Sequence, residues 1–313
     1  MKINKGISSK AVYSKPPYKR AFEKQAYLLL TLPLIGFFVF TMYPLLWAIG
    51  KAWYFYDGAI STQHFVGFKN FISAFSDVSY WRAWLTTLQF AACKLPVELP
   101  LALLLAILLH RKIKGAGIFR AVYFLPHIIS VAIIGLIFTN MFDYFGLINT
   151  WLTKLGIISK NIDWFATKWK AMFVLVSGST WQSFGINLLY FMAALNNIPE
   201  ELYEAASIDG ATAWTQFRKI TVPMMGPVLQ TILLLSINGT LYTNDYIIAT
   251  TNGGPGGDTY TVMSYMVGKF VPGFATVGAN IGYGCCLAVI TAIIMCCIAI
   301  VYNKLSKKLS NIY

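Results

Sequence analysis

Residues 199–227 read PEELYEAASIDGATAWTQFRKITVPMMGP, and this polar stretch separates two long apolar segments of the chain. A helix needs about 20 mainly apolar residues to cross a bilayer. Six segments of the 313-residue sequence are of that kind, and they cover residues 26–50, 84–109, 118–141, 171–195, 224–248 and 278–302. The sequence therefore predicts an all-α integral membrane protein with six transmembrane helices, the third of which Pro126 can kink.

The composition agrees with a membrane protein, because 57% of the residues are hydrophobic and only 12% are charged, against roughly 25% charged residues in an ordinary soluble domain. The net charge of +13 comes mostly from residues outside the apolar segments. It therefore indicates topology and attraction to anionic lipid rather than nucleic-acid binding. The sequence has no phosphate-binding G-x-x-x-x-G-K-[ST] motif, and its three histidines lack metal-ligand spacing. No ATP, metal or other cofactor is expected to bind this chain.

The basic residues fall mainly on one side of the six predicted spans. Because cytoplasmic segments carry an excess of Lys and Arg, both termini and the loop at 196–223 are expected in the cytoplasm. Four lysines of the segment 142–170 would face outward against this rule. The predicted organisation is a cytoplasmic tail at 1–25, a six-span transmembrane domain at 26–302 and a second cytoplasmic tail at 303–313.

The opening stretch predicts a short surface helix over residues 197–211. Pro199 suits the first helical turn, and the acidic residues after it lie near the positive end of the helix dipole. Gly210 can end the helix by adopting a left-handed conformation. A second short helix would run through Trp214 to Pro223, so that the two helices form a bent pair below the membrane.

This stretch resembles the EAA loop of ATP-binding-cassette (ABC) importer permeases. The matching residues are Glu204, Ala205, Ala206, Gly210, Ile220 and Pro223. Further similar stretches are FRAVYFLP at 119–126, GLIN at 146–149 and TNGGP at 251–255. The resemblance covers nearly all of residues 26–302, and the chain is most similar to permeases of carbohydrate-importing systems, the family of the maltose-transporter large permease.

The resemblance implies a permease subunit for ATP-driven uptake of carbohydrate across a bacterial cell membrane, with an oligosaccharide as the expected cargo. Its implied partners are a second permease, two copies of an ABC ATPase that bind ATP and Mg²⁺, and an extracytoplasmic sugar-binding protein. The chain itself would not be an enzyme. Its short surface helix would be the coupling helix that docks on the ATPase, through Glu204, Ala205, Ala206, Asp209 and Gly210.

Polar residues near the end of the fifth predicted span form a candidate substrate contact. Ser236, Thr240 and Thr243 stand at i, i+4 and i+7, so they share one helix face. From this spacing alone, the stripe fits contact with sugar hydroxyls and helix–helix packing equally well. The resemblance favours a substrate pathway, and it adds residues from the third and fourth spans: His127, Val131, Gln182, Ser183 and Ile186.

Lys94 and Glu98 are charged residues inside the second predicted span, and their spacing of four allows them to pair on one helix face. A structural ion pair is favoured over a substrate contact. Two rival functions stay open. Import of glycerol phosphate or another polar solute would use the same fold, although an anion would favour Lys or Arg in the polar stripe, which has neither. A non-transporting membrane receptor or scaffold would explain the spans but not the EAA loop.

Overall fold

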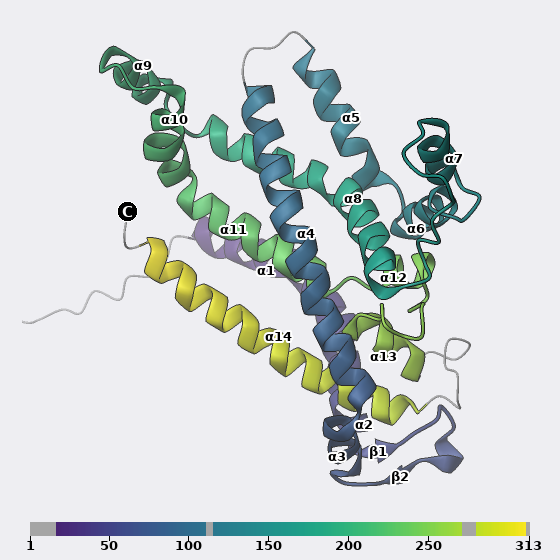
Figure 1. Cartoon of the computed structure of the whole chain (residues 1–313). Helices are drawn as coiled ribbons and strands as arrows, with labels where there is room; N and C mark the ends of the chain where they lie inside the picture. The colour runs from purple at the N-terminus through teal and green to yellow at the C-terminus, as the bar shows by residue number, and fades with distance from the viewer. Residues whose placement is uncertain (1–16, 111–114, 271–279, 311–313) are drawn as a thin grey trace, which may run out of the picture.

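The computed structural model describes residues 17–110, 115–270 and 280–310, and these residues are mostly helical (Figure 1). Most of the predicted N-terminal tail and the end of the predicted C-terminal tail lie outside the described residues. A helical lobe projects at one end of the molecule, and it contains α9 (Glu200–Ile208) and α10 (Ala213–Gln216). A hairpin of β1 (Tyr54–Phe55) and β2 (His64–Phe65) lies at the other end.

The first apolar segment forms one continuous helical run. It consists of α1 (Pro17–Phe37), a wider π turn (η1, Phe38–Met42) and α2 (Tyr43–Lys51). Pro44 stands in the first turn of α2, and in a regular helix its ring would clash with the carbonyl one turn earlier. The wider turn accommodates this proline. The apolar span Lys24–Lys51 has no buried side chain, so its surface is available to lipid or to a partner chain.

The segment between the first and second spans carries the hairpin, the short turn η2 (Ile60–Thr62) and α3 (Lys69–Ser76). Asn70 ties α3 to the end of α2, because its amide donates a hydrogen bond of 2.9 Å to the carbonyl of Ala52. The second span, α4 (Val78–His110), begins directly after this segment.

The third apolar segment is divided into α5 (Ala116–Ile128) and α6 (Val131–Met141), which meet at 94°. Pro126 lacks the amide proton of an ordinary helical residue, and the backbone at Ile129 is extended. Pro126 removes one bond from the last turns of α5, and the extended backbone at Ile129 ends the helix before the apolar segment is complete. The prediction of one span over 118–141 therefore holds only for a sharply bent pair of helices, which is a much larger departure than a proline kink.

The rest of the chain is helical as well. After α7 (Leu147–Lys154) and α8 (Lys168–Asn196) come the lobe, the π turn η3 (Phe217–Thr221), α11 (Val222–Leu241), α12 (Asp245–Thr250), α13 (Val262–Phe270) and α14 (Ile281–Ser310). The end of α14 lies on the side of the molecule where the lobe projects (Figure 1).

Four helical runs in the described chain are long and apolar enough to cross a membrane: Lys24–Lys51, Val78–His110, Ala213–Leu241 and Ile281–Ser306. The bent pair of α5 and α6 raises the number to five. The remaining predicted span lies in α8, whose 29 residues would extend over about 43 Å. Polar residues along α8 keep it out of this apolar set, so the count of six spans stays a prediction.

The most extensive helix–helix contact in the described chain is between α4 and α8. Ala102 of α4 packs with Leu188 and Phe191 of α8 in a buried apolar cluster. On its other side α8 approaches α5 so closely that a Cβ atom at Gly185 would overlap the backbone carbonyl of Tyr123. The absence of a side chain at residue 185 thus permits the crossing of α5 and α8.

We predict that Gly185→Ala lowers the stability of the purified protein by about 1–3 kcal/mol, because an added methyl group in a closed contact forces the backbone to move. Thermal unfolding in detergent measures this loss. Gly117→Ala on α5 is the matched control, since a Cβ atom there meets no atom within 4 Å. Equal melting temperatures for the two variants would contradict the close contact of α5 and α8.

Candidate functional site

A cavity of about 650 Å³ lies between α4, α8 and α11, and α5, α6 and the segment after α11 complete its wall. All the residues that were predicted to line a substrate pathway border this one cavity. They are His127, Val131, Gln182, Ser183, Ile186, Ser236, Thr240 and Thr243. The structure thus brings together residues from three predicted spans that are up to 116 positions apart (243 − 127).

One face of α8 forms the polar wall of the cavity. Ser179, Gln182, Ser183 and Ile186 lie at spacings of three and four, and Asn187 continues the same face. Ser183 donates a hydrogen bond of 2.7 Å to the carbonyl of Ser179 on its own helix. The oxygen and amide groups of this face explain why α8 has a low hydropathy for a membrane helix.

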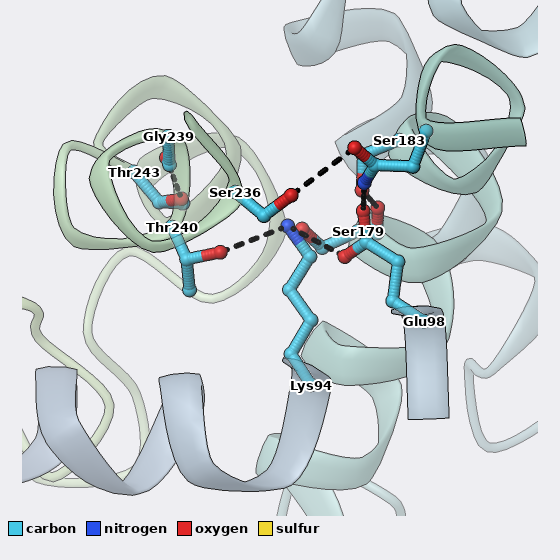
Figure 2. Close-up of polar contacts among 9 residues, drawn as sticks. Lys94, Glu98, Ser179, Ser183, Ser236, Gly239, Thr240 and Thr243 are labelled. Atoms are coloured by element: carbon cyan, nitrogen blue, oxygen red, sulfur yellow. Dashed lines mark hydrogen bonds and ion pairs between the residues drawn. The ribbon is translucent and has the colours of Figure 1, made fainter. Parts of the chain in front are cut away.

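A buried ion pair on α4 borders the cavity (Figure 2). Lys94 Nζ lies 3.3 Å from Glu98 Oε2, and the two residues are only 5% and 1% exposed. The other carboxylate oxygen, Glu98 Oε1, accepts a hydrogen bond of 2.6 Å from Asn187 Nδ2 on α8. The predicted pairing of Lys94 with Glu98 is confirmed, and its position in the cavity wall is an addition that the sequence did not indicate.

The residues of α11 connect to this ion pair. Ser236 Oγ donates to Asn187 Oδ1 at 3.1 Å, and Lys94 Nζ donates to Thr240 Oγ1 at 3.4 Å (Figure 2). These contacts form one network of polar side chains across α4, α8 and α11. Some members of the stripe on α11 therefore bind neighbouring helices.

Thr243 departs from the prediction, because it does not lie on the same helix as Ser236 and Thr240. The helix α11 ends at Leu241, and α12 starts at Asp245. The carbonyl of Thr243 accepts a hydrogen bond of 2.7 Å from the Thr261 hydroxyl instead of continuing the helix. Thr243 still lines the cavity, but from the non-helical segment between α11 and α12.

The sequence prediction did not include Asn187, Asn244 or Asp245, which also border the cavity. Asn187 could have been found, since it follows Ser183 by four residues and so shares its helix face. Three described side chains of the cavity wall have a buried atom without a hydrogen-bond partner: His127 Nδ1, Asn244 Oδ1 and Glu98 Oε2. Glu98 Oε2 lies within ion-pair distance of Lys94, whereas a ligand can supply the missing bond to His127 or Asn244.

The lobe is a second candidate site, and its first helix ends as the sequence predicted. Gly210 has a left-handed backbone with φ of +77°. The amide of Ala211 donates to the carbonyl of Ala206 at 2.9 Å, and the amide of Gly210 donates to Ser207 at 3.1 Å. This pair of bonds is the Schellman arrangement, which closes α9 and turns the chain toward α10.

The predicted coupling residues do not all lie on one face of the lobe. Ala206, Asp209 and Gly210 border a hollow of about 460 Å³ between α9 and the following turn, whereas Glu204 and Ala205 are exposed residues that do not border it. Ile208 and Trp214 are 87% and 68% exposed in the same lobe. No cluster of potential metal ligands is present in the described ranges.

A bundle of apolar helices with an open cavity, lined in part by polar side chains, and with a projecting lobe fits a transport permease. The family model for binding-protein-dependent transport system inner membrane components matches residues 98–311, which is most of the chain, so the protein belongs to that family. The resemblance to ABC importer permeases is thereby confirmed. The chain is a membrane-embedded permease subunit and not an enzyme.

Curated relatives match over most of their length. The lactose transport system permease protein LacF of Rhizobium radiobacter is 31% identical over 271 residues, which cover 85% of this chain and 90% of LacF. The arabinooligosaccharides transport system permease protein AraP of Bacillus subtilis is 33% identical over 291 residues, which cover 91% of this chain and 89% of AraP. Both are permeases by name, as the family assignment requires.

A solved structure has the same fold. In the crystal structure of a bacterial ABC transporter involved in the import of the acidic polysaccharide alginate, one chain superimposes with a TM-score of 0.80 at 22% sequence identity. The match covers 94% of this chain and 98% of the other. The all-α permease fold is therefore shared along nearly the whole length of both chains.

Proposed function

We propose that this chain is the permease subunit of an ATP-driven importer of carbohydrate, and that an oligosaccharide occupies the 650 Å³ cavity during transit. The observation that carries the proposal is the convergence of the eight pathway residues on that cavity. Its volume lies within the range of about 300–1,000 Å³ that is usual for sites that hold small ligands. The relatives named for lactose and arabinooligosaccharides support a sugar as the cargo.

The chemistry of the wall suits sugar hydroxyl groups. A sugar leaves many hydrogen bonds to water when it enters the protein, and each of them needs a replacement. Ser183, Ser236 and Gln182 supply polar groups on facing helices, while His127 and Asn244 each have a buried polar atom without a protein partner. The aliphatic side chains of Val131 and Ile186 can pack against the apolar faces of sugar rings.

The same proposal includes an assembly around this chain. A second permease would complete the pathway, two ABC ATPases would bind ATP and Mg²⁺, and an extracytoplasmic sugar-binding protein would deliver the cargo. The lobe would face the cytoplasm with both tails, at 1–25 and 303–313, and residues 26–302 would form the transmembrane domain. The common side of the lobe and the end of α14 supports this orientation (Figure 1).

The coupling role would belong to the lobe. Its exposed apolar side chains and the hollow beside Gly210 provide a surface that can dock in a groove of the ATPase. Ala205 and Ala206 would allow a close approach because they are small, and Glu204 and Asp209 would add charge to the contact.

We predict that Thr240→Ala slows sugar uptake by roughly two- to tenfold, because one hydrogen bond of about 0.5–1.5 kcal/mol is lost. Thr240→Trp should abolish uptake, since the ring fills the cavity. Uptake into proteoliposomes that contain the assembled complex measures both effects. The control is Thr231→Trp, at an exposed position of α11 outside the cavity wall. Normal uptake by an assembled Thr240→Trp complex would show that the polar stripe is helix packing only.

Gly210→Trp is expected to uncouple ATP hydrolysis from transport. A side chain at a φ of +77° strains the backbone, and the indole ring would also occupy the surface beside the hollow. Gly210→Asn separates the two causes, because Asn tolerates the left-handed conformation and is smaller. The measurement is substrate-stimulated ATPase activity of the reconstituted complex. Full stimulation and uptake with Gly210→Trp would remove the lobe from the coupling mechanism.

The proposed orientation can be tested with single cysteines in a background that lacks the five native ones. Lys160→Cys should react with a membrane-impermeant maleimide from outside intact cells, whereas Asp209→Cys should react only after the membrane is opened. Both positions are exposed, so access within the protein does not limit the reaction. Labelling of both residues from the same side would contradict the six-span topology.

A further inference from the structure

The charges in the cavity wall do not follow the net charge of the chain, which is +13. Within the described residues, the charged side chains that border the cavity are Lys94, Glu98 and Asp245. These three side chains give the wall one positive and two negative charges. A cavity of this kind does not attract an anion, although the protein as a whole is strongly basic.

The positive charge, on Lys94, is already paired with a carboxylate. Lys94 Nζ lies 3.3 Å from Glu98 Oε2 and is within hydrogen-bond reach of Thr240. Glu98 is 1% exposed, and Asn187 binds its second oxygen. Lys94 has three N–H donors, so a carboxylate on a cargo would have to share the ammonium group with Glu98. Two carboxylates beside one buried cation repel each other, which makes this position unfavourable for an acidic sugar.

We propose that the pairing of Glu98 with Lys94 makes the cavity selective for uncharged oligosaccharides over acidic ones such as uronates. This inference rests on the proposed function, because it concerns the same cavity. Glu98 acts as a positioning residue: it neutralises Lys94 and holds the ammonium group in the wall. Neutral sugars then bind through the hydroxyl and amide groups of α8 and α11, while Asp245 repels an entering anion.

A purely structural role for the ion pair predicts a different result. If the pair only stabilised helix packing, Glu98→Gln would weaken the binding of neutral and acidic sugars alike. If it sets selectivity, the same variant frees Lys94 and changes the ratio of the two affinities. The double variant Lys94→Gln/Glu98→Gln has no cation in the wall and so should not gain affinity for acids.

The test uses the complete complex in nanodiscs without its binding protein, so that the selectivity of that protein does not enter. Equilibrium dialysis measures the affinities of trisaccharide pairs that differ only in oxidation at C6. The pairs are α-1,4-galactotriose with α-1,4-trigalacturonate, and cellotriose with β-1,4-triglucuronate. The ratio of acidic to neutral affinity within a pair cancels the effect of sugar stereochemistry and of the amount of folded protein.

The wild-type complex should bind the neutral member of a pair more tightly, and Glu98→Gln should shift the ratio toward the acid by about tenfold or more. Glu98→Asp keeps the negative charge and should therefore retain the wild-type preference for neutral sugar. The double variant should keep that preference too. Asp245→Asn tests the repulsion by Asp245 separately, at an exposed residue. It should also shift the ratio toward the acid, but by a smaller factor.

The outcomes separate the inference from the function on which it rests. A wild-type preference for the uronates, or an unchanged ratio in Glu98→Gln, overturns the role of the ion pair in selectivity and leaves carbohydrate transport intact. If Glu98→Gln does not assemble, the smaller neutral variant Glu98→Ala takes its place in the same comparison. Failure of every saccharide to bind any complex counts against the cavity as a sugar site, and then both proposals fall.

Discussion

A buried carboxylate on α4 constrains the packing of the helices around the cavity. Glu98 is almost completely removed from solvent, and an ionised group in such a place needs both a counter-charge and hydrogen bonds. Lys94 supplies the charge from one turn earlier, and Asn187 supplies a hydrogen bond from α8. Since Asn187 also accepts from Ser236, a slide of α4, α8 or α11 by one turn would leave the carboxylate or the amide unpaired. The alignment of the three helices, and with it the shape of the polar wall, depends on this network.

Close backbone approaches hold the remaining walls in place. Gly185 admits the carbonyl of Tyr123, which brings α5 against α8. Gly135 on α6 faces Ala249 on α12, where an added Cβ atom would lie only 2.8 Å from the Ala249 methyl group. The bend between α5 and α6 allows both contacts, because α5 packs mainly against α8 while α6 packs mainly against α12. His127 and Val131, on the two sides of the bend, therefore reach the cavity from helices with different directions.

The sequence predicted those features that depend on local chemistry. A long apolar run forms a helix whatever packs against it. The left-handed Gly210 ends α9, because the amides of Gly210 and Ala211 bind carbonyls only three and five positions earlier. Two features depended on distant residues and were not foreseen. The end of α11 at Leu241 involves Thr261, whose hydroxyl binds the carbonyl of Thr243 from 18 positions away. The angle of α5 to α6 involves packing against α12, more than 100 residues later in the chain (245 − 141 = 104). The resemblance to a family predicted that pathway residues from three spans lie close together, because it carries information on contacts between distant residues. Helical spacing alone could not decide whether the polar stripe serves helix packing or substrate contact.

Two helices, α8 and α11, join the lobe to the cavity. Tyr203 of α9 makes a hydrogen bond of 2.9 Å with Thr221, which is the last residue of the π turn before α11. From there α11 runs for 20 residues, or about 30 Å, and it carries Ser236 and Thr240 near its far end. The backbone hydrogen bonds of α11 are internal apart from the one that Pro227 lacks, so the helix can transmit displacement along its axis. A shift of the lobe that moved α11 by a fraction of a turn would alter the contacts of Ser236 with Asn187 and of Thr240 with Lys94. Before it reaches these bonds, a movement of the lobe along α11 would also have to shift Met225 and Ile232, which pack with residues of α4 and α8 in a buried apolar cluster.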